Sequence, residues 1–258
     1  MARQARQESV SGYYHVMMRG INREFVFQKD SYKSGFMELV SEQLAPDKIE
    51  LSAWCVMDNH VHMLIRAEKE ALSKAIKAVS VKFAAQYNRD LNRIGPVFGG
   101  RFKSENVEDD SYLLGVLRYI HANPVKAKLV ADASEYRWSS YREYLGVPRY
   151  VSTVQRDFVW SLFDGNEKRF VSHHAEYDDL DYLDTKEDSG RNRDDRAFRL
   201  IEEFCRVNGI VHVDEIHRRR ELFETLCRSL VVDAGLTLRK SAEYLSTTHQ
   251  RVHEAVKD

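Results

Sequence analysis

The sequence predicts an α+β fold: an antiparallel sheet with helices on one face, followed by a small all-α domain. Strand-like and helix-like segments follow one another in the order strand, helix, strand, strand, helix, strand. Two apolar runs, residues 51–57 and 61–65, flank Asp58 and Asn59, whose turn composition favours a tight antiparallel hairpin. Helical spacing throughout residues 196–258 predicts the all-α domain.

Composition argues against a membrane protein and against a disulfide-stabilised scaffold. Of the 258 residues, 31% are charged and 43% hydrophobic, which is typical of a globular protein with one sizeable core and a second small domain. No stretch approaches the roughly 20 apolar residues of a membrane span, and the first residues lack the apolar core of a signal peptide. The three cysteines are scattered and match no zinc spacing. We therefore expect a cytoplasmic protein without a membrane partner.

The net charge of −1 hides an uneven distribution. Residues 176–195 hold nine acidic and three basic side chains, a local charge of −6, which leaves +5 for the remainder. A local basic surface on that remainder would suit nucleic acid. The acidic segment is expected to be a solvated linker, and mimicry of DNA charge is the alternative.

Apolar periodicity predicts the first elements in chain order. A β-rich strand precedes a basic loop, and two amphipathic helices flank the central hairpin. The strand is expected at 13–18, the loop at 19–23, and the helices at 31–44, which Pro46 closes, and at 71–91.

A glycine-rich segment, residues 95–104, interleaves cations with aromatic rings and lets the backbone approach a ligand closely. An edge strand at 105–108 is expected after it. A third helix, 112–123, would be capped by Asp109 or Ser111 and ended by Pro124.

The chain is expected to have three parts. These are a sheet domain at 1–150, an aromatic-rich packing segment with the acidic linker at 151–195, and a helical domain at 196–258. Helices are expected in the last part at 197–207, 219–234, 237–245 and 249–257. The short polar turn 246–248 between the last two is typical of a helix-turn-helix.

His60 and His62 are the central candidate site residues. Side chains two apart in a strand project from the same face, so the two imidazoles would lie roughly 6–7 Å apart and converge on one point. This geometry suits two neutral imidazoles that hold one divalent metal. Incidental spacing of two histidines is the alternative.

Tyr119 and Asn123 are four residues apart on the third predicted helix and share one face of it. If this face meets the histidine pair, the Tyr119 hydroxyl is a candidate nucleophile toward phosphorus, and Asn123 can supply an oxygen as a third metal ligand. The metal would polarise the scissile phosphate. An ordinary tyrosine on an amphipathic face is the alternative that spacing alone leaves open.

Six blocks occur in a defined order along residues 11–146. They are Met18-Arg19-Gly20, residues 57–64, residues 98–104, residues 110–114, residues 118–127 and Trp138-Ser139-Ser140-Tyr141. Together they resemble the REP-associated tyrosine transposases, a branch of the single-tyrosine HUH (IS200-like) transposases. The tail from Arg196 resembles more loosely the DNA-binding C-terminal domain of the bacterial replication initiator DnaA, at residues 236–239 and 248–253.

The resemblance implies a ferredoxin-like HUH fold with Mg²⁺ or Mn²⁺ bound by His60 and His62. It implies Tyr119 as the nucleophile toward single-stranded DNA, leaving a 5′-phosphotyrosine and a free 3′-OH, with Asn123 where a third polar ligand is found. Asp58 stands where many relatives carry proline, which alters the turn. Ile21 lengthens the usual Arg-Gly-Asn run, which leaves the phosphate contacts of that loop in question.

Basic and aromatic side chains around the predicted site suit single-stranded DNA, and the resemblance implies palindromic DNA that folds into a hairpin with a single-stranded flank. Phosphate contacts are expected from four of seven cations: Arg19, Arg23, Arg101, Lys103, Arg118, Lys126 and Lys128. Phe98 and Phe102 are expected to stack unpaired bases. In the C-terminal domain His249, Gln250 and Arg251 would face duplex DNA from the start of the recognition helix.

Three functions therefore compete. The first is a metal-dependent DNA endonuclease and strand transferase, the second a non-catalytic DNA-binding regulator, and the third an RNA-binding module on the same sheet. His60, His62 and Tyr119 together favour the enzyme. The sequence leaves open whether the protein is a monomer or a homodimer, and whether Tyr119 acts within its own subunit.

Overall fold

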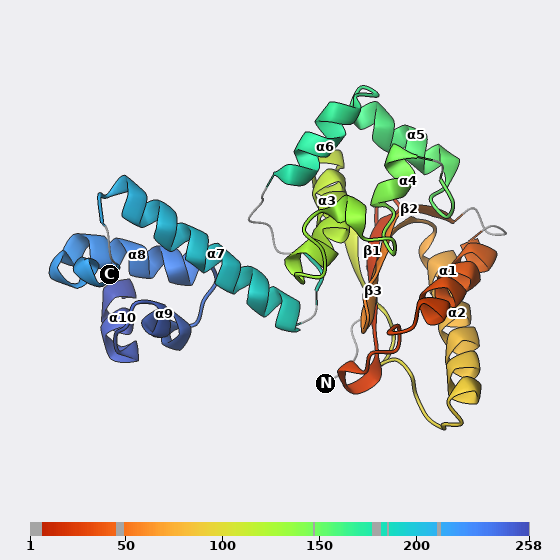
Figure 1. Ribbon diagram of the computed structural model, residues 1–258, viewed down its shortest axis with the longest axis horizontal. Coiled ribbons are helices and arrows are strands. Elements are labelled where there is room, and N and C mark those ends of the chain that lie inside the picture. The colour runs from red at the N-terminus through yellow and green to blue at the C-terminus, as the bar shows by residue number, and fades with distance from the viewer. Residues whose placement is uncertain are drawn as a thin grey trace. The chain divides into compact units, whose positions relative to one another are not determined.

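The computed structural model describes residues 7–44, 49–146, 148–176, 182–184, 186–210 and 213–257. The chain forms two compact units, Met1–Leu183 and Asp184–Asp258, each with its own hydrophobic core. The first unit contains the sheet and the second is helical (Figure 1).

The sheet of the first unit has four antiparallel strands in the order β2-β3-β1-β4. Their bounds are β1 Tyr13–Arg19, β2 Glu50–Val56, β3 His60–Arg66 and β4 Lys103–Val107. This is the strand order of a ferredoxin-like βαββαβ unit, and the predicted α+β class with its antiparallel sheet is confirmed. In the β1–β3 register, Met17 lies opposite His62 and Arg19 opposite His60.

Helices cover both faces of this sheet (Figure 1). The two helices of the βαββαβ unit, α1 Asp30–Leu44 and α2 Lys69–Asp90, pack together on one face, as predicted. The other face carries α3 Asp110–Lys126 with the later helices of the first unit. The sequence pattern did not show that α3 would lie apart from α1 and α2.

An aromatic cluster joins α1 and α2 to the loops before β4. The rings of Phe27, Phe36, Phe83 and Phe98 have centroids 5.1–6.4 Å apart, and all four are buried. Each such aromatic side chain buries a large apolar area, so the cluster anchors this helical layer on the sheet.

The helix α3 is longer than the sequence pattern predicts. Its N-cap is Asp109, whose side chain accepts a hydrogen bond from the Tyr112 N–H at 2.8 Å, as one of the two expected caps. The prediction that Pro124 ends the helix is wrong, because the helix continues through it to Lys126. A proline this close to the end removes one hydrogen bond of the last turn, a cost that the burial of Pro124 and its neighbours offsets.

Three further helices complete the first unit: α4 Tyr141–Leu145, α5 Thr153–Leu162 and α6 Glu167–Ala175. Short 3₁₀ turns lie at Ile21–Arg23 and Ala133–Glu135. The buried Glu143 connects α4 and the chain that follows it to the edge strand β2 through hydrogen bonds. Its carboxylate accepts hydrogen bonds from the Trp54 indole at 2.8 Å and from the backbone N–H groups of Arg149, Tyr150 and Val151 at 2.6–2.9 Å.

The second unit contains α7 Lys186–Val207, the 3₁₀ segment Val213–Arg218, α8 Arg220–Val232, α9 Leu238–Tyr244 and α10 His249–Val256. Leu226, Leu230, Leu245 and Val252 lie at the centre of its core. The segment that we expected to be a linker up to Asp195 is helical from Lys186 onward. Residues 177–181 and 185 of that acidic segment lie outside the described residues. None of the helices in the described ranges is both long and apolar enough to cross a bilayer.

Replacing Glu143 with glutamine should lower the free energy of unfolding of the first unit by about 2–3 kcal/mol. The amide keeps the shape but puts an NH₂ group where backbone N–H donors now find an acceptor, leaving buried donors unsatisfied. Urea denaturation followed by tryptophan fluorescence measures the change. The exposed Glu42→Gln, which removes only a surface ion pair with Lys82, should stay within about 0.5 kcal/mol of the unsubstituted protein. Equal stability of the two variants would contradict the role of Glu143.

Candidate active site

His60 and His62 lie on the face of the sheet that α3 covers. Both side chains are buried, at 3% and 0% exposure, and their ring centroids are 5.0 Å apart with the planes nearly perpendicular. The convergence expected from the strand period is therefore present.

His15 is a third buried histidine at this point, and it comes from the neighbouring strand. Its Nε2 lies 2.9 Å from His62 Nδ1, a hydrogen bond between two fully buried rings. Its Nδ1 lies 4.0 Å from the Glu105 carboxylate on β4. The sequence reasoning missed His15, although it has the same period-two position in β1 as Tyr13 and Met17, which face the same side.

Tyr119 of α3 packs its ring edge against the histidines. The centroid of the ring lies 5.5 Å from that of His62 and 5.7 Å from that of His15. Lys126, two turns further along α3, places its ammonium 4.8 Å from the centroid of the Tyr119 ring. A cation at this distance favours negative charge on the phenol oxygen or on a phosphate beside it.

Tyr182 covers Tyr119. The two ring centroids are 4.9 Å apart, and Tyr182 also stacks on Tyr112 at 5.6 Å. The backbone N–H of Leu183 donates to the Glu105 carboxylate at 3.1 Å, which holds this segment beside β4. Tyr119 is only 2% exposed, and Tyr182 is one of the side chains that cover it.

Asn123 lies one helical turn after Tyr119 and is buried. Its side-chain amide donates a 3.2 Å hydrogen bond to the Tyr119 carbonyl oxygen, so the amide oxygen is the atom left for a ligand. The role of Asn123 as a metal ligand remains a prediction.

The residues present fit a divalent ion. The Nε2 atom of His62 is buried without a hydrogen-bond partner among the described residues, which is the state that a metal ligand requires. His60 Nδ1 lies 2.6 Å from the Asn59 side-chain oxygen, which accepts its proton and leaves the lone pair on Nε2. Within the described ranges, no three His, Cys, Asp or Glu side chains are arranged so that all could hold one metal ion, so further ligands would be an amide, water or phosphate.

Burial keeps His15 and His62 neutral. It lowers the pKa of His15 to about 3 and, together with the charges of His60 and His15, lowers the pKa of His62 well below its usual range. Neutral imidazoles are the form that binds metal, so the site is ready for an ion at neutral pH.

A second histidine pair, the buried His121 and the half-buried His174, joins α3 to α6. His121 Nδ1 lies 2.8 Å from His174 Nε2, and His174 Nδ1 donates to the Phe170 carbonyl at 2.8 Å. Burial lowers the pKa of His174 to about 3 and, with the nearby charge of His174, lowers the pKa of His121 well below its usual range. This pair ties α3 to α6, and His121 Nε2 lies 2.8 Å from the Ser140 hydroxyl, which is hydrogen-bonded to the Trp54 backbone in β2.

Several of the cations predicted to bind DNA are exposed, whereas Arg118 already contacts other residues of the first unit. Arg23, Arg101, Lys103 and Lys128 are exposed, and Arg19 is half-buried opposite His60. Arg19 ends β1, and the segments that carry Arg23 and Arg101 meet at this His60 end of the sheet: Gly20 pairs with Phe98, and the Gly20 N–H donates to the Asn59 carbonyl at 2.8 Å. Arg118 instead donates to the His173 carbonyl at 3.2 Å and pairs with Glu176, so its side chain is already bound to α6 and its flank.

The structure corrects the role expected for Phe98. Its ring belongs to the aromatic cluster of α1 and α2 and is only 8% exposed, so it cannot stack a base in this conformation. Phe102 is half-buried and packs at the edge of the core. The glycine-rich spacing suggested exposure for both rings, but only tertiary packing decides which ring is buried.

Of the three residues expected to face duplex DNA, His249 and Gln250 are exposed at the start of α10. Gln250 contacts Glu254 in the next turn at 3.2 Å. Arg251 donates to the His217 carbonyl at 3.0 Å and lies over the Phe223 ring, so it contributes to the packing of the second unit itself.

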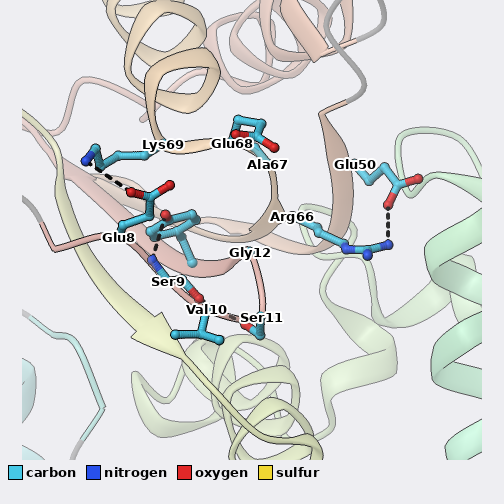
Figure 2. Close-up of a pocket in the computed structure, with 11 residues that line it drawn as sticks. Glu8, Ser9, Val10, Ser11, Gly12, Glu50, Arg66, Ala67, Glu68 and Lys69 are labelled. Carbon is cyan, nitrogen blue, oxygen red and sulfur yellow. Dashed lines mark hydrogen bonds and ion pairs between the residues drawn. The ribbon is translucent and has the colours of Figure 1, made fainter.

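The cavity of about 540 Å³ in Figure 2 lies elsewhere in the first unit. It is bounded by residues 8–12, the end of β3 and the start of α2, and it contains none of the histidines described above. Lys69 pairs with Glu8 at 3.5 Å and Arg66 with Glu50 at 3.6 Å, so the charges around it largely neutralise one another (Figure 2).

The ferredoxin-like sheet, its histidine pair and the helical tyrosine that faces them all lie within one segment that matches a family model. Residues 8–123 match the family model described as "Transposase IS200 like". This segment begins in the N-terminal arm, includes the whole sheet, and ends at Asn123 in α3. Residues 8–123 of this chain are thus similar to the IS200-like transposases.

Two solved structures are similar at a distance. One is a REP-associated tyrosine transposase bound to a REP hairpin, with 16% identity and a TM-score of 0.48 over 56% of this chain and 86% of that one. The other is a protein from Deinococcus radiodurans R1 described as a transposase, with 18% identity and a TM-score of 0.33 over 46% of this chain and 94% of that one. A comparison with curated proteins gave no match.

The stability of the first unit should fall as the pH drops below about 6.5. A histidine whose folded pKa lies near 3 binds fewer protons in the folded than in the unfolded state between pH 3 and 6.5, so stability is lost as the pH falls through this window. For each such histidine, the free energy of unfolding should fall by about 2 kcal/mol when the pH is lowered from 7 to 5.

Urea denaturation at pH 7 and at pH 5, in the presence of a chelator, measures this dependence. His174→Gln should reduce the difference between the two pH values by about 2 kcal/mol, since it removes one of the buried groups. An unfolding free energy that does not change between pH 7 and 5 would contradict the neutral state of these histidines.

Proposed function

We propose that the protein is a metal-dependent single-stranded DNA endonuclease and strand transferase that acts through a 5′-phosphotyrosine on Tyr119. The observation that carries this proposal is the meeting of His60, His62 and Tyr119 in one buried site of a domain similar to the IS200-like transposases. His60 and His62 would hold Mg²⁺ or Mn²⁺ through Nε2, with the amide oxygen of Asn123 as a third ligand. Bound there, the ion would polarise the scissile phosphate and stabilise the charge that develops on it.

In the cleavage step Tyr119 Oη forms a bond to phosphorus while the bond from phosphorus to the 3′ oxygen breaks. The phenol proton passes to that oxygen, and the strand leaves as a free 3′-OH. Strand transfer is the reverse step: a 3′-OH attacks the phosphotyrosine and the tyrosine recovers its proton. One ester bond replaces another each time, so the reaction needs no additional energy source.

Residues around Tyr119 would support this exchange. Lys126 lies close enough to the ring to favour the phenolate as the proton leaves. Tyr182 would move aside when substrate arrives, since it now covers the nucleophile.

The expected substrate is a DNA hairpin with a single-stranded flank. Arg19 at the end of β1 and the segments that carry Arg23 and Arg101 meet at the His60 end of the sheet. Lys103 is exposed on the neighbouring edge strand β4. Four cations in this position suit a phosphate backbone that runs into the site.

Replacing Tyr119 with phenylalanine should abolish formation of a covalent DNA–protein adduct. The assay incubates the full chain and Mn²⁺ with end-labelled single-stranded DNA that carries a hairpin. Denaturing gels and mass spectrometry then detect the adduct and locate it. Tyr112→Phe is the matched control because Tyr112 lies on the same helix, and it should keep the adduct.

An adduct that survives in Tyr119→Phe, or that forms equally in excess chelator, would contradict the mechanism. Tight binding of hairpins without an adduct under any metal condition would favour the alternative function, a non-catalytic DNA-binding regulator.

We propose further that the second unit docks duplex DNA through α9 and α10. The two helices are joined by residues 245–248 and pack on each other and on α8. His249 and Gln250 are exposed at the N-terminal end of α10, where a recognition helix meets base edges.

Gln250→Ala should weaken duplex binding by the full chain by about 1–3 kcal/mol at fixed salt concentration, as expected for the loss of a base contact. Fluorescence anisotropy with labelled duplex DNA measures this affinity. Thr225→Ala, an exposed polar change on α8, is the control and should leave the affinity unchanged. Equal affinities of Gln250→Ala and the unsubstituted protein would overturn the assignment of α10.

A further inference from the structure

His15 makes a hydrogen bond to the side chain of His62 that orients this ring. The two residues lie on neighbouring strands, β1 and β3, and both are fully buried. The distance of 2.9 Å between His15 Nε2 and His62 Nδ1 is that of a good hydrogen bond between ring nitrogens.

The position of the proton between these rings follows from the requirement for a ligand. A neutral imidazole carries one proton, and a metal binds the nitrogen that lacks it. If His62 Nε2 holds the ion, the proton of His62 is on Nδ1, and His15 Nε2 must accept it. The proton of His15 is then on Nδ1, which faces the Glu105 carboxylate at 4.0 Å.

Packing restricts the freedom of both rings. The edge of the Tyr119 ring packs against both imidazoles, with centroids 5.5 and 5.7 Å away. The partner ligand His60 has an equivalent acceptor, the Asn59 side-chain oxygen at 2.6 Å from its Nδ1. Each histidine of the pair thus has its own acceptor on Nδ1, and His15 is the one that comes from a different strand.

We propose that His15 is a positioning residue of the metal site: its Nε2 accepts the Nδ1–H of His62 and thereby directs His62 Nε2 at a divalent cation. This inference rests on the metal site proposed above. Groups that accept a hydrogen bond from a metal-bound imidazole fix its tautomer and orientation, and their loss typically weakens metal binding about 10–100-fold.

The first test measures the imidazole ¹⁵N chemical shifts of the metal-free full chain by NMR. The signals of His62 are assigned by their disappearance in His62→Gln. We expect the proton of His62 on Nδ1 and the lone pair on Nε2. A proton on His62 Nε2 would overturn the proposal without the need for any variant at position 15.

The second test measures the affinity for Mn²⁺ by calorimetry, without DNA. His15→Leu removes the acceptor and should weaken Mn²⁺ binding about 10–100-fold. His15→Gln puts an amide oxygen near the position of Nε2 and should restore most of the affinity. Met17→Leu changes another buried side chain on β1, the one opposite His62, and should bind as the unsubstituted protein does.

The outcomes separate this inference from the proposed enzyme. Equal weakening in His15→Leu and His15→Gln would show that packing alone matters, and unchanged binding in His15→Leu would show that His62 needs no acceptor. Either result overturns the role of His15, as does the absence of Mn²⁺ binding by the unsubstituted protein. Normal Mn²⁺ binding without any DNA adduct would refute the endonuclease and leave the role of His15 standing.

Discussion

The register between β1 and β3 is the constraint on which the site depends. These central strands pair without interruption from Tyr13 opposite Arg66 to Arg19 opposite His60. Because side chains alternate between the faces of a sheet, a slip of one residue in β3 would turn His60 and His62 toward α1 and α2. The same register places His15 diagonally across from His62. The pairing of these two strands therefore positions both the histidine pair and His15, the proposed acceptor for His62.

The helix α3 adds Tyr119, the proposed nucleophile, by an equally simple periodicity. Gly115, Tyr119 and Asn123 are four residues apart and therefore lie along one face. Tyr182 lies against this face, and a Cβ at Gly115 would overlap its hydroxyl group. The absence of a side chain at Gly115 thus lets Tyr182 approach closely enough to cover Tyr119. The pair of His121 and His174 ties the helix to α6.

The sequence predicted those features that depend on local periodicity. The hairpin, the α+β class, and the shared face of Tyr119 and Asn123 all follow from spacings of two or four residues. The features that it failed to predict depend on tertiary contacts: the pairing of His15 with His62, the burial of Phe98 and the position of Tyr182 over the site. The prediction that Pro124 ends the third helix was wrong for a related reason, because the packing of α3 outweighs the local preference of proline to end a helix.

Burial links the stability of this domain to its chemistry. A histidine in water is partly protonated near neutral pH and then has no lone pair to offer to a metal. Desolvation removes that competition at His62 but leaves a polar ring inside the core, which costs free energy unless its N–H is hydrogen-bonded. His15 and Asn59 meet this requirement for the two histidines. A site of this kind is therefore preorganised at neutral pH, and protons that would compete with a metal for its ligands would also weaken the fold that presents them.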